Sequence, residues 1–383
     1  MNSSFELDQD HREFRAVCRA FVDKRILPLV EEAERRREFP ASLWPEMAQA
    51  GMLGLGHPEE HGGSGGGTLA IAILSEELGR SSGGIAVTPL VSSYMAAPHL
   101  THFGTPEQQQ HYLAPLLAGR AVAAIAITEP GAGSDVAGIS TLAKPADGGY
   151  SLSGTKMFIT NGGIADTLIV AARTDPADRH HGITMFIVER DAPGFTVGRP
   201  LQKMGWHASD TRELIFQDCF VPDSRVLGAI GGGFGQIMHA FQTERITLAG
   251  MGVGLAAAAL DDALAYAKER SAFGSPIGSF QRIRHSLAQM ATDVHAARLV
   301  TYQAAAKIDS GGDFAGDVAM AKLISARVAN EVADRAVQIF GGYGYIEETR
   351  VAMHYRDARI LPIGGGTDEV QLEILAKRMG LGA

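Results

Sequence analysis

The sequence predicts an α+β fold in three consecutive parts, because the period of its apolar residues changes twice along the chain. Up to about residue 110, apolar residues recur every three to four positions, as they do in helices. From about residue 121 to 228, short apolar runs alternate with Asp, Gly and Pro, and the helical period then returns. We therefore expect an N-terminal all-α domain over 1–120, a middle β domain over 121–230 and a C-terminal α-helical domain over 231–383.

The N-terminal part opens with an amphipathic helix. Its apolar face comprises Phe14, Val17, Cys18, Phe21 and Val22. The run His-Gly-Gly-Ser-Gly-Gly-Gly over 61–67 predicts a loop, and a second apolar helix follows over 69–78.

The middle part has the short apolar runs of a β domain. The clearest are 121–127, 167–172, 184–188 and 213–216. His180 and His181 lie in a polar loop between two of them, where a solvated surface pair is expected because no further His or Cys accompanies it.

Past the three glycines 231–233 the helical period returns. The run Gly-Met-Gly-Val-Gly over 250–254 follows no strand, so we expect it to serve close helix packing and not nucleotide binding.

Composition excludes several classes of function. The counts of 34 basic and 43 acidic residues give a net charge of −9, which disfavours nucleic acid and anionic membranes as partners. Gly and charged residues interrupt the apolar stretches before they reach the ~20 residues of a membrane span. Cys18 and Cys219 have no metal-type spacing, and we expect a reducing cytoplasm.

Two segments carry the most specific signal. Residues 128–135 read Thr-Glu-Pro-Gly-Ala-Gly-Ser-Asp after an apolar strand, and residues 158–163 read Phe-Ile-Thr-Asn-Gly-Gly at the end of another. Hydroxyls and free amides at strand ends suit the polar edge of a planar heterocycle, and the aromatic side chain of Phe158 suits its face. In this order and spacing, the pair resembles the acyl-CoA dehydrogenase family, whose members hold FAD on these strands.

The resemblance covers nearly the whole chain and implies a β-sandwich or barrel in the middle domain and a C-terminal four-helix bundle. It also implies FAD as cofactor. The residues that match positions around the flavin ring are Ile127, Thr128, Ser134, Phe158 and Thr160. Those that match the segment holding the FAD pyrophosphate of a neighbouring subunit are Arg270, Phe273, Gln281, Gln338 and Gly342. Those that match positions around the adenosine half are Thr367 and Glu369. Phe158 stands where many members have Trp, and Ala272 stands where many have Thr.

One helix of the C-terminal part carries a carboxylate on an otherwise apolar face. That face comprises, at spacings of three and four, Ile237, Phe241, Glu244, Leu248, Met251 and Leu255. Burying an ionised carboxylate there without a partner costs on the order of several kcal/mol, so the pKa of Glu244 should be raised. The alternative is a structural ion pair between Glu244 and a neighbouring Lys or Arg.

The resemblance favours a catalytic role for Glu244. Most family members carry the catalytic Glu near the C-terminus, directly before Gly-Thr, where this chain has Gly365. The isovaleryl-CoA and long-chain branches instead place the base on the earlier helix before an Arg, and this chain has Glu244 and Arg245 there. The resemblance thus implies Glu244 as base, the backbone N–H of Gly365 as a donor to the substrate carbonyl, and Ser134 and Arg245 as substrate contacts. Arg245 could equally serve to fix the helix.

The implied reaction is the FAD-dependent α,β-dehydrogenation of an acyl-CoA thioester to the trans-2-enoyl-CoA. Gly365 lacks the bulky side chain of other members, so we expect a 3-methyl-branched acyl chain, or a medium or long one. The family further implies a homotetramer, a dimer of dimers with FAD at the subunit interface, and an electron-transferring flavoprotein as acceptor.

Two other functions remain open at this point. Relatives that oxidise acyl or aminoacyl groups, such as prolyl, on carrier proteins also place the base on the earlier helix. A non-catalytic or DNA-binding relative belongs to another class, but it would need a basic extension that this sequence lacks.

Overall fold

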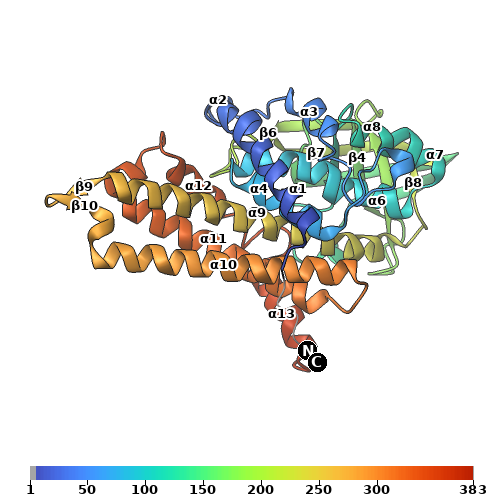
Figure 1. Cartoon of the computed structure of the whole chain (residues 1–383). Helices are drawn as coiled ribbons and strands as arrows, with labels where there is room; N and C mark the ends of the chain where they lie inside the picture. The colour runs from blue at the N-terminus through green and yellow to red at the C-terminus, as the bar shows by residue number, and fades with distance from the viewer. Residues whose placement is uncertain (1–5, 383) are drawn as a thin grey trace.

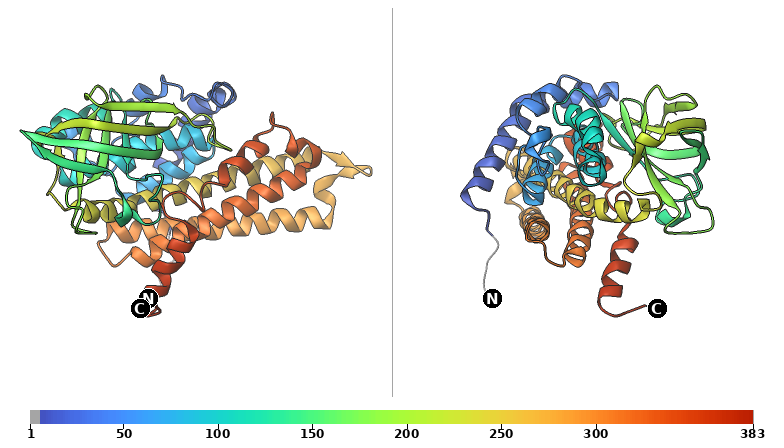
Figure 2. Two further views of the ribbon diagram at one scale, coloured as in Figure 1. Left: turned by 180° about the vertical axis from the view of Figure 1, so that it is seen from behind. Right: turned by 90° about the vertical axis from the view of Figure 1, so that its right-hand side faces the viewer.

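The computed structural model describes residues 6–382, so residues 1–5 and 383 of the predicted terminal domains lie outside the described chain. The described chain runs from helices to strands and back to helices, as Figures 1 and 2 show. The last N-terminal helix ends at Leu117, the first strand begins at Ala123, and the first long C-terminal helix begins at Gly233. This order confirms the predicted α+β class.

The N-terminal part is built around α4, whose residues are all buried. Its α-helices are α1 (Gln9–Phe21), α2 (Val30–Arg36), α3 (Leu43–Gln49), α4 (Thr68–Gly79), α5 (Gly83–Leu90), α6 (Ala97–Phe103), α7 (Pro106–Gln108) and α8 (Ala114–Leu117). Short 3₁₀ and π turns connect several of them. The predicted first helix is confirmed, although Val22 begins one of these π turns and Val17 is exposed.

The middle part is an eight-stranded sheet. Its strands are β1 (Ala123–Ala126), β2 (Leu142–Ala146), β3 (Gly149–Thr160), β4 (Thr167–Arg173), β5 (Ile183–Glu189), β6 (Phe195–Pro200), β7 (Thr211–Pro222) and β8 (Val226–Leu227). They lie in the order β6-β7-β3-β2-β4-β5-β8, and β1 pairs with β4 in parallel. Strands β4 and β5 are buried along almost their whole length, which explains their continuous apolar sequence.

The C-terminal part is a bundle of long antiparallel helices that extends away from the sheet (Figure 1). Its elements are α9 (Gly233–Glu269), β9 (Ser271–Ala272), β10 (Ser275–Pro276), α10 (Gln281–Asp309), α11 (Ala315–Phe340), α12 (Arg350–Ala358) and α13 (Asp368–Arg378). One apolar core lies among α9, α10 and α11 and includes Met290, Val294, Val328 and Val332. These apolar residues of α10 and α11 therefore serve packing within the chain.

Helices α4 and α9 approach closely because α9 is rich in glycine where they touch. A Cβ atom at Gly254 would lie 1.9 Å from the carbonyl oxygen of Glu76, and one at Gly250 would lie 2.7 Å from that of Ala72. No larger residue fits at these positions unless a backbone moves. The glycine run 250–254 therefore serves helix packing, as the sequence predicts.

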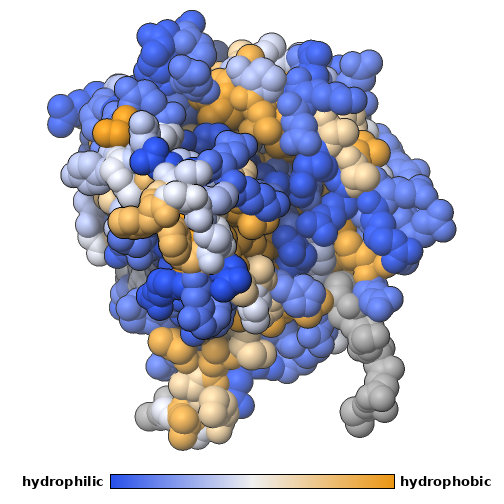
Figure 3. Space-filling view, turned by 60° about the vertical axis from the view of Figure 1, so that its left-hand side comes forward, coloured by the Kyte–Doolittle hydropathy of each residue, from blue (hydrophilic) through white to orange (hydrophobic). Residues whose placement is uncertain are grey.

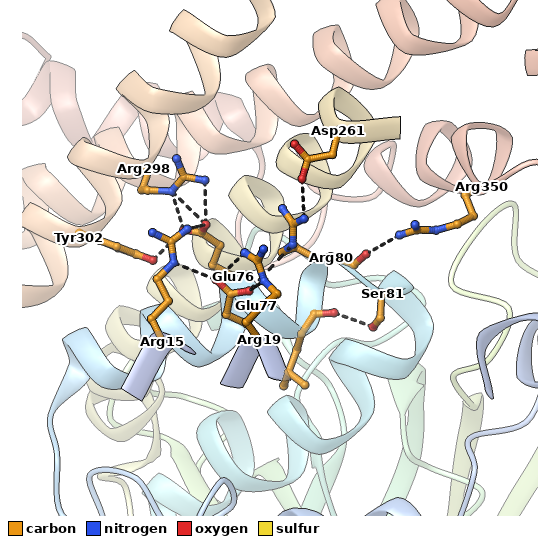
Figure 4. Close-up of polar contacts among 11 residues, drawn as sticks. Arg15, Arg19, Glu76, Glu77, Arg80, Ser81, Asp261, Arg298, Tyr302 and Arg350 are labelled. Carbon is orange, nitrogen blue, oxygen red and sulfur yellow. Dashed lines mark hydrogen bonds and ion pairs between the residues drawn. The ribbon is translucent and has the colours of Figure 1, made fainter. Parts of the chain in front are cut away.

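Two buried carboxylates of α4 are surrounded by arginines (Figure 4). Glu76 pairs with Arg15 at 2.7 Å and with Arg298 at 2.8 Å. It also accepts a hydrogen bond from Tyr302 at 2.7 Å, while Glu77 pairs with Arg15 at 2.9 Å. Because these partners come from α1 and α10, the cluster ties the N-terminal part to the helical bundle.

Helix α9 is more apolar than we expected from the Gly and charged residues that interrupt its sequence. Among the described residues, it is the one helix whose length and composition would suit a membrane span. Of its most apolar stretch, 72% is buried inside the molecule. The apolar residues of α9 are thus used in packing against its neighbours.

Candidate active site

Glu244 lies on α9 and is half-buried among the apolar residues of its stripe. Ile237, Leu248 and Met251 of that stripe are each buried. Among the residues that the structure describes, no Lys or Arg nitrogen lies within 4.0 Å of the Glu244 carboxylate, which also accepts no hydrogen bond. Burial raises the pKa of Glu244 to about 7, although the charges of Arg245 and Lys322 oppose the shift. The structural ion pair considered as an alternative is therefore absent here.

Gly365 faces Glu244 from the segment between α12 and α13. A Cβ atom at residue 365 would lie 3.4 Å from Oε1 of Glu244, so the two positions meet at one point in space. Gly365 has a φ of 66°, a conformation that favours glycine. Its N–H donates no hydrogen bond to another described residue and is free to bind a ligand. The same Cβ would lie only 2.3 Å from Cδ1 of Leu248, so that side chain fills part of the space.

Arg245 is buried beside Glu244, and among residues 6–382 no carboxylate forms an ion pair with it. Only 7% of the residue is exposed, and its Nε makes no hydrogen bond. The guanidinium carbon lies 5.6 Å from the centre of the Phe241 ring. Burial lowers the pKa of Arg245. An unpaired buried guanidinium suits the binding of an oxygen-bearing ligand, which fits a substrate contact better than a purely structural role.

The two segments of the sequence motif lie side by side. The N–H of Met157, next to Phe158, donates to the carbonyl oxygen of Thr128 at 2.8 Å. The hydroxyls of Thr128, Ser134 and Thr160 form no hydrogen bond with another described residue, nor do the N–H groups of Ile127 and Thr128. Phe158 is 67% exposed. This edge of the sheet therefore presents free donors, free hydroxyls and one aromatic face.

A buried ion pair that the sequence analysis missed supports this edge. The ammonium group of Lys156 donates to the carbonyl oxygen of Ile127 at 2.9 Å and to Glu129 at 2.8 Å. Burial opposes the charge of Glu129, but Lys156 and the N–H groups of Ser140 and Thr141 outweigh it and lower the pKa of Glu129 to about 2. Glu129 lies inside the motif 128–135, and a carboxylate that is buried there requires a positively charged partner. That requirement is the signal in the sequence that could have indicated Lys156.

The second predicted cofactor set lies at the far tip of the bundle, by β9 and β10 (Figure 1). Arg270 and Gly342 line a cavity of about 470 Å³ there, together with Tyr266, Ile277, Ile339, Phe340, Gly341, Tyr343 and Ile346. Phe273 is 98% exposed, and Gln281 and Gln338 are also exposed. A single chain thus keeps this set apart from the motif edge.

Thr367 and Glu369 lie at the start of α13, beyond Gly365. The Thr367 hydroxyl caps the helix by accepting a hydrogen bond from the N–H of Val370 at 3.3 Å. Glu369 is exposed in the first turn of the helix. The unpaired donors at the motif edge suit the polar ring edge of FAD, and the open cavity with Arg270 suits its anionic pyrophosphate.

Known protein families match the chain in three consecutive parts. Family models match for the acyl-CoA dehydrogenase N-terminal domain over residues 8–120, the middle domain over 124–219 and the C-terminal domain over 231–380. The mitochondrial isovaleryl-CoA dehydrogenase of Solanum tuberosum is 38% identical over 99% of this chain and 92% of its own length.

Two solved structures are similar over the whole chain. Butyryl-CoA dehydrogenase from Megasphaera elsdenii is 41% identical with a TM-score of 0.95, covering 98% of this chain and 100% of that one. PigA with FAD and proline is 31% identical with a TM-score of 0.94, covering 99% of this chain and 100% of that one. The chain therefore belongs to the acyl-CoA dehydrogenase family of FAD-dependent oxidoreductases.

Proposed function

We propose that Glu244 is the base in the α,β-dehydrogenation of an acyl-CoA thioester to its trans-2-enoyl product. The observation that supports this most is the position of Gly365, whose absent Cβ would stand 3.4 Å from Oε1 of Glu244. A carboxylate on α9 therefore reaches the place that a side chain at residue 365 would occupy. A raised pKa of about 7 also brings the base close to neutral pH, where general bases work best.

The chain's own residues supply the proton chemistry. Glu244 takes the α-proton, and the N–H of Gly365 donates a hydrogen bond to the thioester oxygen as negative charge develops there. A donor fixed at a developing oxyanion contributes ~3–4 kcal/mol. Glycine suits this position because its φ of 66° disfavours other residues. When bound on the motif edge, FAD would supply the acceptor for the hydride of the β-carbon.

For the substrate we propose a 3-methyl-branched acyl group, or one of medium or long chain, since residue 365 has no side chain to obstruct the β-carbon. The similarity to the Solanum tuberosum isovaleryl-CoA dehydrogenase supports this choice. A short straight chain is the second candidate. It is favoured by the 2.3 Å approach of Leu248 to the Cβ position of residue 365 and by the 41% identity to butyryl-CoA dehydrogenase.

For the assembly we propose a homotetramer built as a dimer of dimers, with FAD between subunits. The separation of the two cofactor sets within one chain supports it. Helix α13 also projects from the body with apolar side chains exposed, visible at the lower end of Figure 3. Leu372 is 53% exposed and Met379 is 75% exposed. We further propose an electron-transferring flavoprotein as acceptor and the cytoplasm as compartment, where the buried thiols of Cys18 and Cys219 would stay reduced.

The deciding experiment is anaerobic bleaching of the flavin absorbance by a series of acyl-CoAs. We expect rapid bleaching of the wild type and a rate about 10²–10⁴-fold lower in Glu244→Gln. The matched control is Asp261→Asn, which removes another carboxylate from α9 at an exposed ion pair with Arg80. Equal bleaching by wild type and Glu244→Gln would show that the base lies elsewhere.

The same series separates the substrates. A higher kcat/KM for isovaleryl-CoA than for butyryl-CoA supports the branched-chain proposal, and the reverse ratio supports the short straight chain. Bleaching by a prolyl-loaded or acyl-loaded carrier protein, without any response to acyl-CoAs, would point instead to a carrier-bound substrate. The similarity of this chain to PigA, whose structure contains FAD and proline, supports the carrier-bound substrate as an alternative.

A further inference from the structure

A fully buried lysine, Lys322, lies next to the candidate active site, on helix α11. Lys322 has no exposed surface, although the positions around it on α11, such as Val318, Ala321 and Ala326, are buried and apolar. Burying an ammonium group is costly unless strong acceptors replace its water. A lone lysine in this apolar stretch therefore needs a specific reason, just as Glu244 does on α9.

The acceptors of Lys322 enclose the segment that carries Gly365. Its Nζ donates to the carbonyl oxygen of Leu361 at 2.5 Å and to that of Gly366 at 3.2 Å. The side-chain amide of Gln371 donates to the same oxygen of Gly366 at 3.1 Å. The two carbonyl oxygens bound by Lys322 thus lie directly before and directly after residues 362–365. Hydrogen bonds from a charged donor are the stronger ones, so this contact holds the segment firmly.

The charge of Lys322 also acts on Glu244. The charged groups around this point are Glu244 and Arg245 on α9, Lys322 on α11, Asp368 and Glu369 on α13, and Arg359 after α12. Arg245 and Lys322 are the two cations that favour the ionised form of Glu244. Lys322 is the one that comes from another element, and its own pKa is lowered by burial to about 8. It therefore still carries its charge at neutral pH.

We propose that Lys322 is a positioning residue for the dehydrogenation. Its buried ammonium group holds the segment that presents the Gly365 N–H opposite Glu244, and its charge favours the carboxylate form of Glu244. The second half of this inference rests on the proposed role of Glu244 as the base, whereas the first half does not. Lys322 thus acts on both groups: it fixes the position of the Gly365 N–H, and it favours the ionised form of Glu244.

The test uses the purified flavoprotein with Lys322→Met, Lys322→Gln and a control. Lys203→Met is the control, because Lys203 is a half-buried lysine with protein acceptors and a pKa lowered to about 8, and it lies in the middle domain. The pKa of Glu244 is read from the carboxyl band in pH-dependent infrared difference spectra, assigned by its loss in Glu244→Gln. The rate of amide hydrogen exchange in peptides over 361–366 measures how firmly Lys322 holds this segment.

We expect the pKa of Glu244 to rise by about one pH unit in both Lys322 variants, since both remove the nearby positive charge. Exchange over 361–366 should rise more in Lys322→Met than in Lys322→Gln, which keeps an N–H donor. Neither change is expected in Lys203→Met. If Lys322→Met does not fold, Lys322→Gln carries the same test of the charge.

An unchanged pKa of Glu244 together with unchanged exchange over 361–366 would overturn the inference. A failure of the proposed function gives a different result. If the pKa of Glu244 in the infrared spectra changes but the pH dependence of kcat/KM does not, then Lys322 is placed correctly and Glu244 is not the base. If both move together, Lys322 positions the catalytic group.

Discussion

Glu244 and Gly365 face each other across the candidate active site, although α9 and the segment before α13 lie far apart in the sequence. Oε1 of Glu244 stands 3.4 Å from the point where a Cβ of residue 365 would lie. A carboxylate from α9 therefore takes the position that a side chain from the later segment would use. Leu248, one turn further along α9, closes the remaining space at 2.3 Å from the same point.

The rate should depend on the ionisation of Glu244. A base must be deprotonated to act, and burial raises the pKa of Glu244 to about 7. We expect kcat/KM to rise about tenfold for each pH unit below 7 and to level off above it. The measurement is kcat/KM between pH 5.5 and 9 with one acyl-CoA. A profile already flat at pH 5.5 would contradict a base with a raised pKa.

The same raised pKa predicts that Glu244 destabilises the fold at high pH. The ordinary carboxyl pKa is 4.5, so the unfolded chain gives up this proton more readily than the folded chain does. The wild type should therefore lose stability relative to Glu244→Gln as the pH rises from about 4.5 to 7, with no further loss above 7. Thermal unfolding should show a Tm on the order of a few degrees higher for Glu244→Gln at pH 8, and nearly equal values at pH 4.5. A Tm difference independent of pH would exclude this explanation.

Removing Lys156 should weaken both the fold and the flavin site. Lys156→Met leaves the buried carboxylate of Glu129 without its cation and frees the carbonyl oxygen of Ile127. Breaking a buried pair in this way costs about 3–5 kcal/mol. We expect a lower Tm and loss of flavin during gel filtration. The double variant Lys156→Met with Glu129→Gln should recover part of the stability, because no unpaired charge remains. Full flavin retention in Lys156→Met would show that this pair does not support the cofactor edge.

Leu248 should control which acyl chains enter. Leu248→Ala removes the side chain that fills the space beside Gly365, at a cost of about 2–5 kcal/mol in stability. The ratio of kcat/KM for isovaleryl-CoA over butyryl-CoA should rise severalfold in this variant. Met251→Ala is the control, since Met251 is buried one turn further along the same helix. An equal ratio in wild type and Leu248→Ala would remove Leu248 as a determinant of branching.

Much of the site could be anticipated from local sequence. The change of apolar period predicted the order of helices and strands, because each element is specified by residues that are neighbours in the chain. The hydroxyl-rich turns after two strands predicted a cofactor edge, and the free hydroxyls of Thr128, Ser134 and Thr160 agree with it. Glu244 was recognisable because a carboxylate interrupts an apolar helical face, and burial is what raises its pKa.

Contacts between distant elements could not be anticipated in the same way. Nothing near Lys322 in the sequence indicates that its ammonium group binds the carbonyl oxygens of Leu361 and Gly366, and nothing near Leu248 indicates that it fills the space at Gly365. The sequence alone therefore determined which elements form and which residue types could do the chemistry. The tertiary structure decided which of them meet, because packing between helices depends on side-chain shape across the whole fold and leaves no local pattern.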